Sequence, residues 1–152
     1  MATDQLVNRE MISITALLTI RVKTALVNIE RGNRDQKTLW AIGRAQEFLN
    51  SVVQEIEDIE TLRIHTRHFK NEPNYLLAKG ARDDLQASDG VETFSGQDAF
   101  REEMKMLRGL CSSIITNQVI IVQDFDKLQQ FFEALYDYTQ YQKGQHRATR
   151  QH

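Results

Sequence analysis

The chain has little of what a disulfide scaffold, a β-sheet protein or a membrane protein needs. A single cysteine, Cys111, excludes an intrachain disulfide framework and a multi-cysteine zinc site. One proline and seven glycines in 152 residues supply too few turns for a many-stranded β fold. The longest stretches without a charged residue, about 11–20 and 109–123, are too short or too polar to span a bilayer.

Charge of one sign is also lacking. The formal net charge is −2 and the pI is about 6.1, whereas a dedicated nucleic-acid-binding domain is usually strongly basic. The first residues show no basic stretch leading into an apolar run and a cleavage site. We therefore expect a cytoplasmic protein with no membrane partner. Hydrophobic residues at 41% and charged residues at 26% are typical of a globular domain.

What the chain does have is helical periodicity. Residues 4–31 carry apolar side chains at steps of three and four, and Gly32-Asn33 supplies the left-handed turn that ends a helix. A second helix is predicted from Asp35, as its N-cap, to about residue 70, before Pro73. The linker 71–97 is predicted to contain a short helix around 75–87.

The third long segment has the most regular pattern. From Phe100 to Leu135 an apolar seam alternates steps of four and three, and its one polar member is Gln118. This continuity favours one helix over about 98–142, which would be ~67 Å long. A compact globule of this size is only about 40 Å across. Gln118 therefore marks either a break in the helix or a polar position in the seam.

These patterns predict an all-α fold of one domain. The favoured architecture is an elongated antiparallel helical bundle, with three long helices plus a short helix in the linker. If the last helix breaks near 112–118, the alternative is a four-helix bundle. Residues 1–142 are predicted to form the bundle and 143–152, where the apolar period is lost, a flexible basic tail.

A basic cluster lies at residues 63–70. Arg63, Arg67 and Lys70 are spaced by four and three residues, so they share one helical face that could contact a phosphate or an acidic partner. Cations near the end of a helix also complement its dipole, which is the alternative explanation.

Arg63 and His68 form an Arg-x4-His spacing that resembles the catalytic motif of HEPN-type ribonucleases, which are α-helical bundles acting as dimers. In that family the residue after the arginine is usually polar, whereas here it is Ile64, and the same spacing recurs at Arg147 and His152. The resemblance implies an alternative function as an RNA-binding subunit or ribonuclease, with Arg63 and His68 as catalytic residues.

Other candidate chemistry has a structural explanation. His65 and His68 could offer two imidazoles to a metal, but no further ligand set accompanies them, so we expect neither a metal nor another cofactor. Cys111 lies on the seam and is predicted to be a buried hydrophobe. The carboxylates are predicted to lie on solvated faces, including Glu55, Glu57, Asp58, Glu60, Glu102 and Glu103.

A second apolar stripe flanks the seam of the last helix. It comprises Met106, Leu110, Ile115, Val119, Val122, Phe131 and Tyr136. We expect two copies of the chain to pair through this stripe, alone or with the first helix alongside, because exposed apolar area on this scale marks an interface. The expected function is a non-enzymatic helical interaction or regulatory module that forms a homodimer and binds a protein partner.

Overall fold

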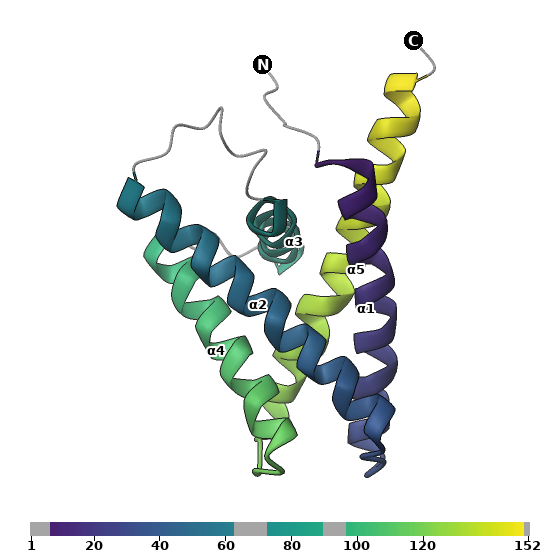
Figure 1. Ribbon diagram of the computed structural model, residues 1–152, viewed down its shortest axis with the longest axis vertical. Coiled ribbons are helices and arrows are strands. Elements are labelled where there is room, and N and C mark those ends of the chain that lie inside the picture. The colour runs from purple at the N-terminus through teal and green to yellow at the C-terminus, as the bar shows by residue number, and fades with distance from the viewer. Residues whose placement is uncertain (1–6, 63–72, 90–96, 151–152) are drawn as a thin grey trace.

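In a computed structural model, the described residues 7–62, 73–89 and 97–150 form helices and their connections, without any strand (Figure 1). This confirms the all-α class. The helices are α1 (Arg9–Glu30), α2 (Gln36–Leu62), α3 (Pro73–Asp89), α4 (Gln97–Ile115) and α5 (Val122–Arg150).

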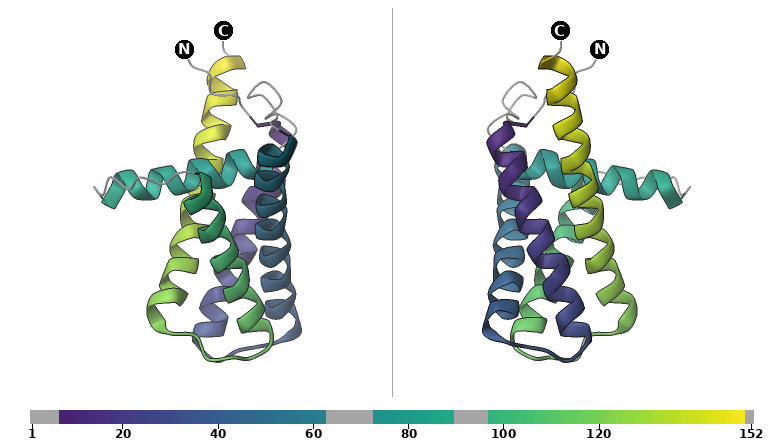
Figure 2. Two further views of the ribbon diagram at one scale, coloured as in Figure 1. Left: turned by 90° about the vertical axis from the view of Figure 1, so that its left-hand side faces the viewer. Right: turned by 90° about the vertical axis from the view of Figure 1, so that its right-hand side faces the viewer.

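The four longer helices alternate in direction and form two neighbouring pairs, α1 with α5 and α2 with α4 (Figure 1). The pairs come together at the end of the bundle where the α1–α2 and α4–α5 connections lie, and they diverge toward the other end. Figure 2 shows α3 lying crosswise to the other helices, and it contacts both α2 and α5. The molecule is therefore a four-helix bundle opened at one end by a fifth, transverse helix.

The turn between α1 and α2 follows the sequence signals. Gly32 adopts a φ of 83°, and the N–H of Asn33 donates to the carbonyl of Asn28 at 2.8 Å. This is the backbone pattern with which a left-handed residue closes a helix. The Asp35 carboxylate then accepts a hydrogen bond from the N–H of Thr38 at 2.8 Å, so Asp35 caps α2 as predicted.

The prediction of one unbroken helix over 98–142 is wrong. α4 ends at Ile115, and residues 116–121 form a connection before α5. Asn117 takes a left-handed φ of 60°, and the N–H of Gln118 donates to the carbonyl of Ser113 at 2.8 Å. The next four residues, 119–122, are all β-branched, which disfavours continuing the helix. Gln118 therefore lies in a turn and not in a helix seam.

The apolar residues keep the same spacing on both sides of this turn because of the number of residues between them. Ile114 before the turn and Leu128 after it are both buried, and they lie fourteen residues apart, which is two heptads. The pattern on either side therefore stays in phase, although the chain reverses direction between them.

Contacts from α2 fix the start of α3. The Glu55 carboxylate accepts hydrogen bonds from the Tyr75 N–H at 2.7 Å and the Asn74 side chain at 3.2 Å. The carboxylate satisfies donors that the first turn of a helix leaves free. The buried residues Leu77 and Ala81 then anchor α3 in the core, which confirms the short helix predicted around 75–87.

The helical end of the chain also differs from the prediction. The sequence suggested that regular structure stops near residue 142, whereas α5 continues to Arg150. Within α5, Thr139 and Gln142 are buried polar residues. The Gln142 amide donates to the Tyr138 hydroxyl at 3.0 Å and accepts from the N–H of Val7 at 3.4 Å. Polar contacts with the segment before α1 thus extend the packed part of α5 beyond its apolar seam.

Candidate functional site

Among the described helices, α1 carries the most exposed large hydrophobic residues. Its buried side carries Ile12, Val22 and Leu26, which are almost fully inaccessible to solvent. Its outer side carries a second row, the α1 stripe, whose members are 38–51% exposed: Ile14, Leu17, Ile20 and Val27. A helix that is apolar on two faces requires cover on both. In this chain the bundle covers one face of α1.

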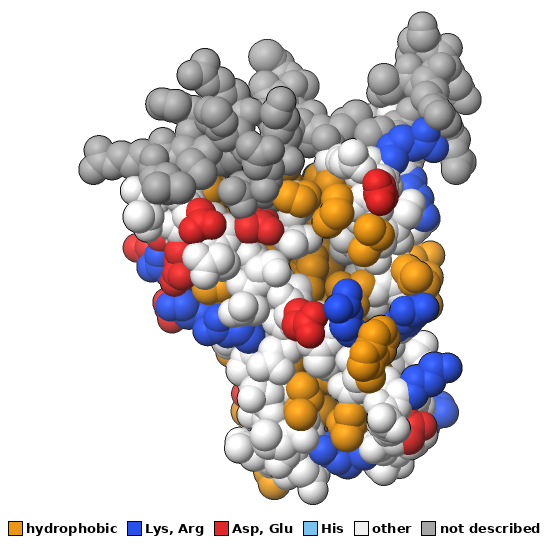
Figure 3. Space-filling view, viewed as in Figure 1, with side chains coloured by type: hydrophobic (Ala, Val, Ile, Leu, Met, Phe, Trp, Pro, Cys, Tyr) orange, Lys and Arg blue, Asp and Glu red, His pale blue; other side chains and the backbone are white. Residues whose placement is uncertain are grey.

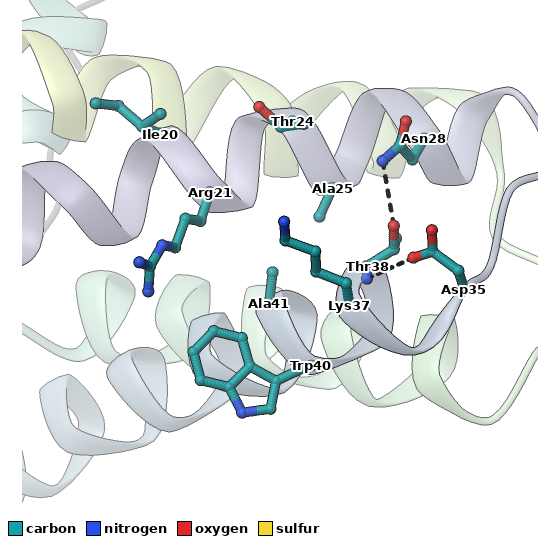
Figure 4. A pocket seen from close by; sticks show the side chains of 10 residues that line it. All are labelled: Ile20, Arg21, Thr24, Ala25, Asn28, Asp35, Lys37, Thr38, Trp40 and Ala41. Atoms are coloured by element: carbon teal, nitrogen blue, oxygen red, sulfur yellow. Dashed lines mark hydrogen bonds between the residues drawn. The ribbon is translucent and has the colours of Figure 1, made fainter.

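A tryptophan lies beside the α1 stripe. Trp40, near the start of α2, is 54% exposed. The guanidinium groups of Arg21 and Arg44 lie 5.9 and 5.7 Å from the ring centroid, one from each helix. Attraction between a cation and the face of an aromatic ring stabilises this arrangement. The indole is thus held in place at the surface by two arginines. Figure 4 shows one of them, Arg21, beside the ring.

A groove of about 570 Å³ runs between α1 and α2 next to this tryptophan. The Asn28 amide donates to the Thr38 hydroxyl at 3.1 Å across it, which joins the two helices (Figure 4). The lining residues are Ile20, Arg21, Thr24, Ala25 and Asn28 from α1, and Asp35, Lys37, Thr38, Trp40 and Ala41 from the other side. We call this the Trp40 groove.

The charges of the groove have both signs. Hydrogen bonds from Thr38 lower the pKa of the Asp35 carboxyl, so it is ionised at neutral pH. Asp35 accepts from the Thr38 N–H at the N-terminus of α2, so its negative charge occupies the place where a helix would otherwise bind an anion. Arg44 forms an ion pair with Glu47 at 3.1 Å, while Arg21 forms none with a described residue. The groove therefore combines apolar area with separate charges and is not a concentrated anion site.

Figure 3 shows hydrophobic side chains interspersed with arginines and lysines on the right of this view, where α1 and the start of α2 lie. Tryptophan and arginine are the residue types most enriched where protein interfaces derive their affinity. Trp40 was not predicted as a site residue from the sequence. The available signal was a lone tryptophan between Lys37 and Arg44 at steps of three and four.

The structure does not assemble the stripe that the sequence predicted on the last helix. Phe131 is only 1% exposed, so its assignment to an interface is wrong. It is buried because α5 contacts α1, α3 and α4 and so needs a wider apolar face than one seam. Val119 and Val122 are 98% and 74% exposed but lie at the α4–α5 turn. Met106 is exposed on α4, while Leu110, Ile115 and Tyr136 are half-buried.

The basic cluster Arg63, Arg67, His68 and Lys70 lies outside the described residues, as does His65. Among the residues that are described, no group of three or more histidines, cysteines or acidic residues is placed to hold a metal ion. Cys111 is buried as predicted, and this burial raises the pKa of its thiol to about 12.

Several carboxylates considered for acid–base chemistry make structural contacts. Glu55 caps α3. Glu60 pairs with Arg101, and Glu103 accepts from Arg82 at 2.8 Å. These contacts tie α2 and α3 to α4, which accounts for the carboxylates without a reaction.

One described helix, α1, is long and apolar enough to cross a membrane by length and composition. In the fold, 39% of that stretch is buried against the other helices. Core helices of soluble proteins pass the same test, so this is weak support for a membrane segment. Comparison of the chain with protein-family models, curated proteins and solved structures finds no match.

Proposed function

We propose that the chain is a non-enzymatic helical interaction module that self-associates and binds a protein partner through one face of α1 and α2. The observation that carries this proposal is the α1 stripe, a half-exposed aliphatic row, beside the Trp40 indole held between Arg21 and Arg44. Covering these groups would remove apolar surface from water, which stabilises a complex by about 25 cal/mol for each Å² buried.

The geometry suits an interface better than a pocket for a small molecule. The Trp40 groove lies between two helix surfaces, and the aliphatic row continues along α1 on either side of it. A surface with an aromatic anchor at its centre and polar or charged groups around it resembles the usual plan of protein interfaces. The engaged carboxylates of α2 and α4 also favour an architectural role.

Trp40 makes the proposal directly testable because it is the chain's only tryptophan. Sedimentation equilibrium and tryptophan emission can be followed on the same samples from about 0.1 to 100 µM. We expect the mean mass to rise toward that of a dimer while the emission maximum moves to shorter wavelength over the same range. Leu17→Glu should keep the helical circular dichroism but remain monomeric. Glu133→Lys, an exposed change on α5, is the control and should not alter assembly.

A wild-type chain that stays monomeric with unchanged emission contradicts self-association. The RNA alternative is tested with labelled RNA over a salt series. Saturable binding that weakens steeply with salt would replace the interaction module by a nucleic-acid-binding function, because phosphate contacts release counterions.

A further inference from the structure

The charges at the two ends of α1 point to the occupant of its exposed face. We infer that α1 pairs antiparallel with α1 of a second copy across a two-fold axis, with Glu10 of each copy opposite Arg31 of the other. This inference rests on the proposed function and specifies its surface, orientation and partner.

Four exposed residues lie along one line of α1. Glu10, Leu17, Thr24 and Arg31 are spaced by seven residues, and each is exposed. A seven-residue spacing is close to two helical turns, so these side chains share one side of the helix. The line spans about 32 Å. The α1 stripe residues Ile14, Ile20 and Val27 flank it, so along this line an apolar centre lies between the acidic Glu10 and the basic Arg31. The adjacent exposed residues Arg9 and Glu30 lie about 100° further round the helix, away from the line.

Only the antiparallel orientation brings opposite charges together at both ends of the line. In an antiparallel pair, the Glu10 end of one helix lies beside the Arg31 end of the other, and the two-fold axis creates this opposite-charge contact twice. A parallel pair would place Glu10 against Glu10 and Arg31 against Arg31. The helix dipoles also oppose each other favourably when the helices are antiparallel. Neither Glu10 nor Arg31 forms an ion pair with another described residue of its own chain.

The centre of the line accommodates the axis. Leu17 of one copy faces Thr24 of the other, which places Ile20 and Arg21 near the two-fold axis. Two arginines close to an axis would repel each other, but each Arg21 guanidinium lies over its own Trp40 ring. This contact directs the charge toward α2 and leaves the arginine stem to add apolar contact area.

A lipid surface is the competing occupant of an exposed apolar helix face. Interfacial helices typically carry lysine and arginine on their polar flanks. The flanks of the α1 stripe carry both signs, with Glu10 at one end and Asp35 in the Trp40 groove. The mixture matches a self-complementary protein surface, so a second copy is the better occupant.

Charge reversal tests the orientation. In sedimentation equilibrium, Glu10→Arg and Arg31→Glu should each weaken the dimer about tenfold, because two attractive contacts become repulsive. The double variant E10R/R31E should restore the dimer to within about threefold of wild type. Glu133→Arg, an exposed reversal on α5, is the matched control and should leave the dissociation constant unchanged.

Cross-linking gives a readout that does not depend on electrostatics. Leu17→Cys/Thr24→Cys should form a disulfide-linked dimer under mild oxidation, while neither single variant should, because like positions lie about 10 Å apart along the antiparallel axis. The natural thiol does not compete, because Cys111 is buried with its pKa raised to about 12.

The outcomes separate this inference from the proposed function. A wild-type dimer that is indifferent to both single reversals, or a double variant weaker than either, overturns the antiparallel α1 pairing while self-association stands. Efficient cross-linking of Leu17→Cys alone also overturns it. A monomer at all concentrations overturns both proposals. A monomer that floats with vesicles of 70% phosphatidylcholine and 30% phosphatidylserine assigns the face to lipid and likewise overturns the inference.

Discussion

Gly80 shows how one missing side chain sets the packing of a helix. A Cβ added at this position would lie 2.2 Å from Cζ of Tyr138, so the glycine allows α3 to approach α5 closely. At Gly109, which is exposed on α4, an added Cβ would have nothing within 4 Å. The two glycines therefore differ in what they do for the fold.

We expect Gly80→Ala to lower the free energy of unfolding by about 1–2 kcal/mol, because the Tyr138 ring must move and this outweighs the better helix propensity of alanine. Gly109→Ala should raise it by up to about 1 kcal/mol. Urea denaturation followed by circular dichroism measures both. Equal stabilisation by the two changes would show that Tyr138 does not contact α3 closely.

At the scale of a helix, the decisive residue is Asn117. Its φ of 60° lies in the left-handed region, where asparagine and glycine are tolerated and other residues are strained. Asn117→Ala should lower the free energy of unfolding by about 1 kcal/mol, whereas Asn117→Gly should leave it unchanged or slightly higher. Asn50→Ala, within helical α2, provides the comparison for asparagine loss without a left-handed backbone; it also removes the hydrogen bond that the Asn50 side chain accepts from Arg108 at 2.8 Å, so its cost is an upper bound for that comparison.

The same turn explains what periodicity could and could not predict. The seam correctly identified Met104, Leu107, Cys111, Ile114 and Leu128 as core. The seam did not reveal the reversal of the chain because the turn preserves the heptad phase. Apolar residues are buried on both sides of the turn, so the pattern of apolar positions looks the same for one helix as for two. Asn117-Gln118 followed by the four β-branched residues 119–122 was the local signal of a break. The helix ends that carry their own signals, at Gly32 and Asp35, were predicted correctly.

The candidate site was less predictable because it depends on the packing of whole helices. The apolar spacing of residues 4–31 predicts the helix, but which of its side chains stay exposed depends on where α5 and α2 lie. Phe131 was assigned to a surface, whereas the packing of α5 against its neighbouring helices leaves it buried. The Trp40 groove arises from residues of two helices brought together by the turn between them, and no spacing within one helix encodes it.

For the whole molecule, α3 is the element that separates the two helix pairs. Arg82 anchors it: the side chain is 5% exposed, donates to Glu103 at 2.8 Å and lies over the Phe100 ring at 5.4 Å. Arg82→Ala should lower the free energy of unfolding by about 2 kcal/mol, less than for a fully buried pair because Glu103 is 35% exposed.

Two further variants provide comparisons for Arg82→Ala. Arg82→Met retains the apolar stem over Phe100 and should lose less than Arg82→Ala. Lys79→Ala removes a solvated ion pair with Asp83 on the same helix and should stay within about 0.5 kcal/mol of wild type. If Arg82→Ala is as mild as Lys79→Ala, the α3–α4 ion pair does not anchor the transverse helix.

The contact between the two turns gives the bundle unequal ends. A guanidinium nitrogen of Arg34, in the α1–α2 turn, donates to the carbonyl of Ile115 at the end of α4, 3.3 Å away. That contact fastens the two helical hairpins together where they already converge, whereas the far end opens around α3. Native-state fluctuations should follow this polarity, with partial openings that release α3 and leave both hairpin turns protected from amide hydrogen exchange. The hairpin end would then be the last cooperative unit to unfold.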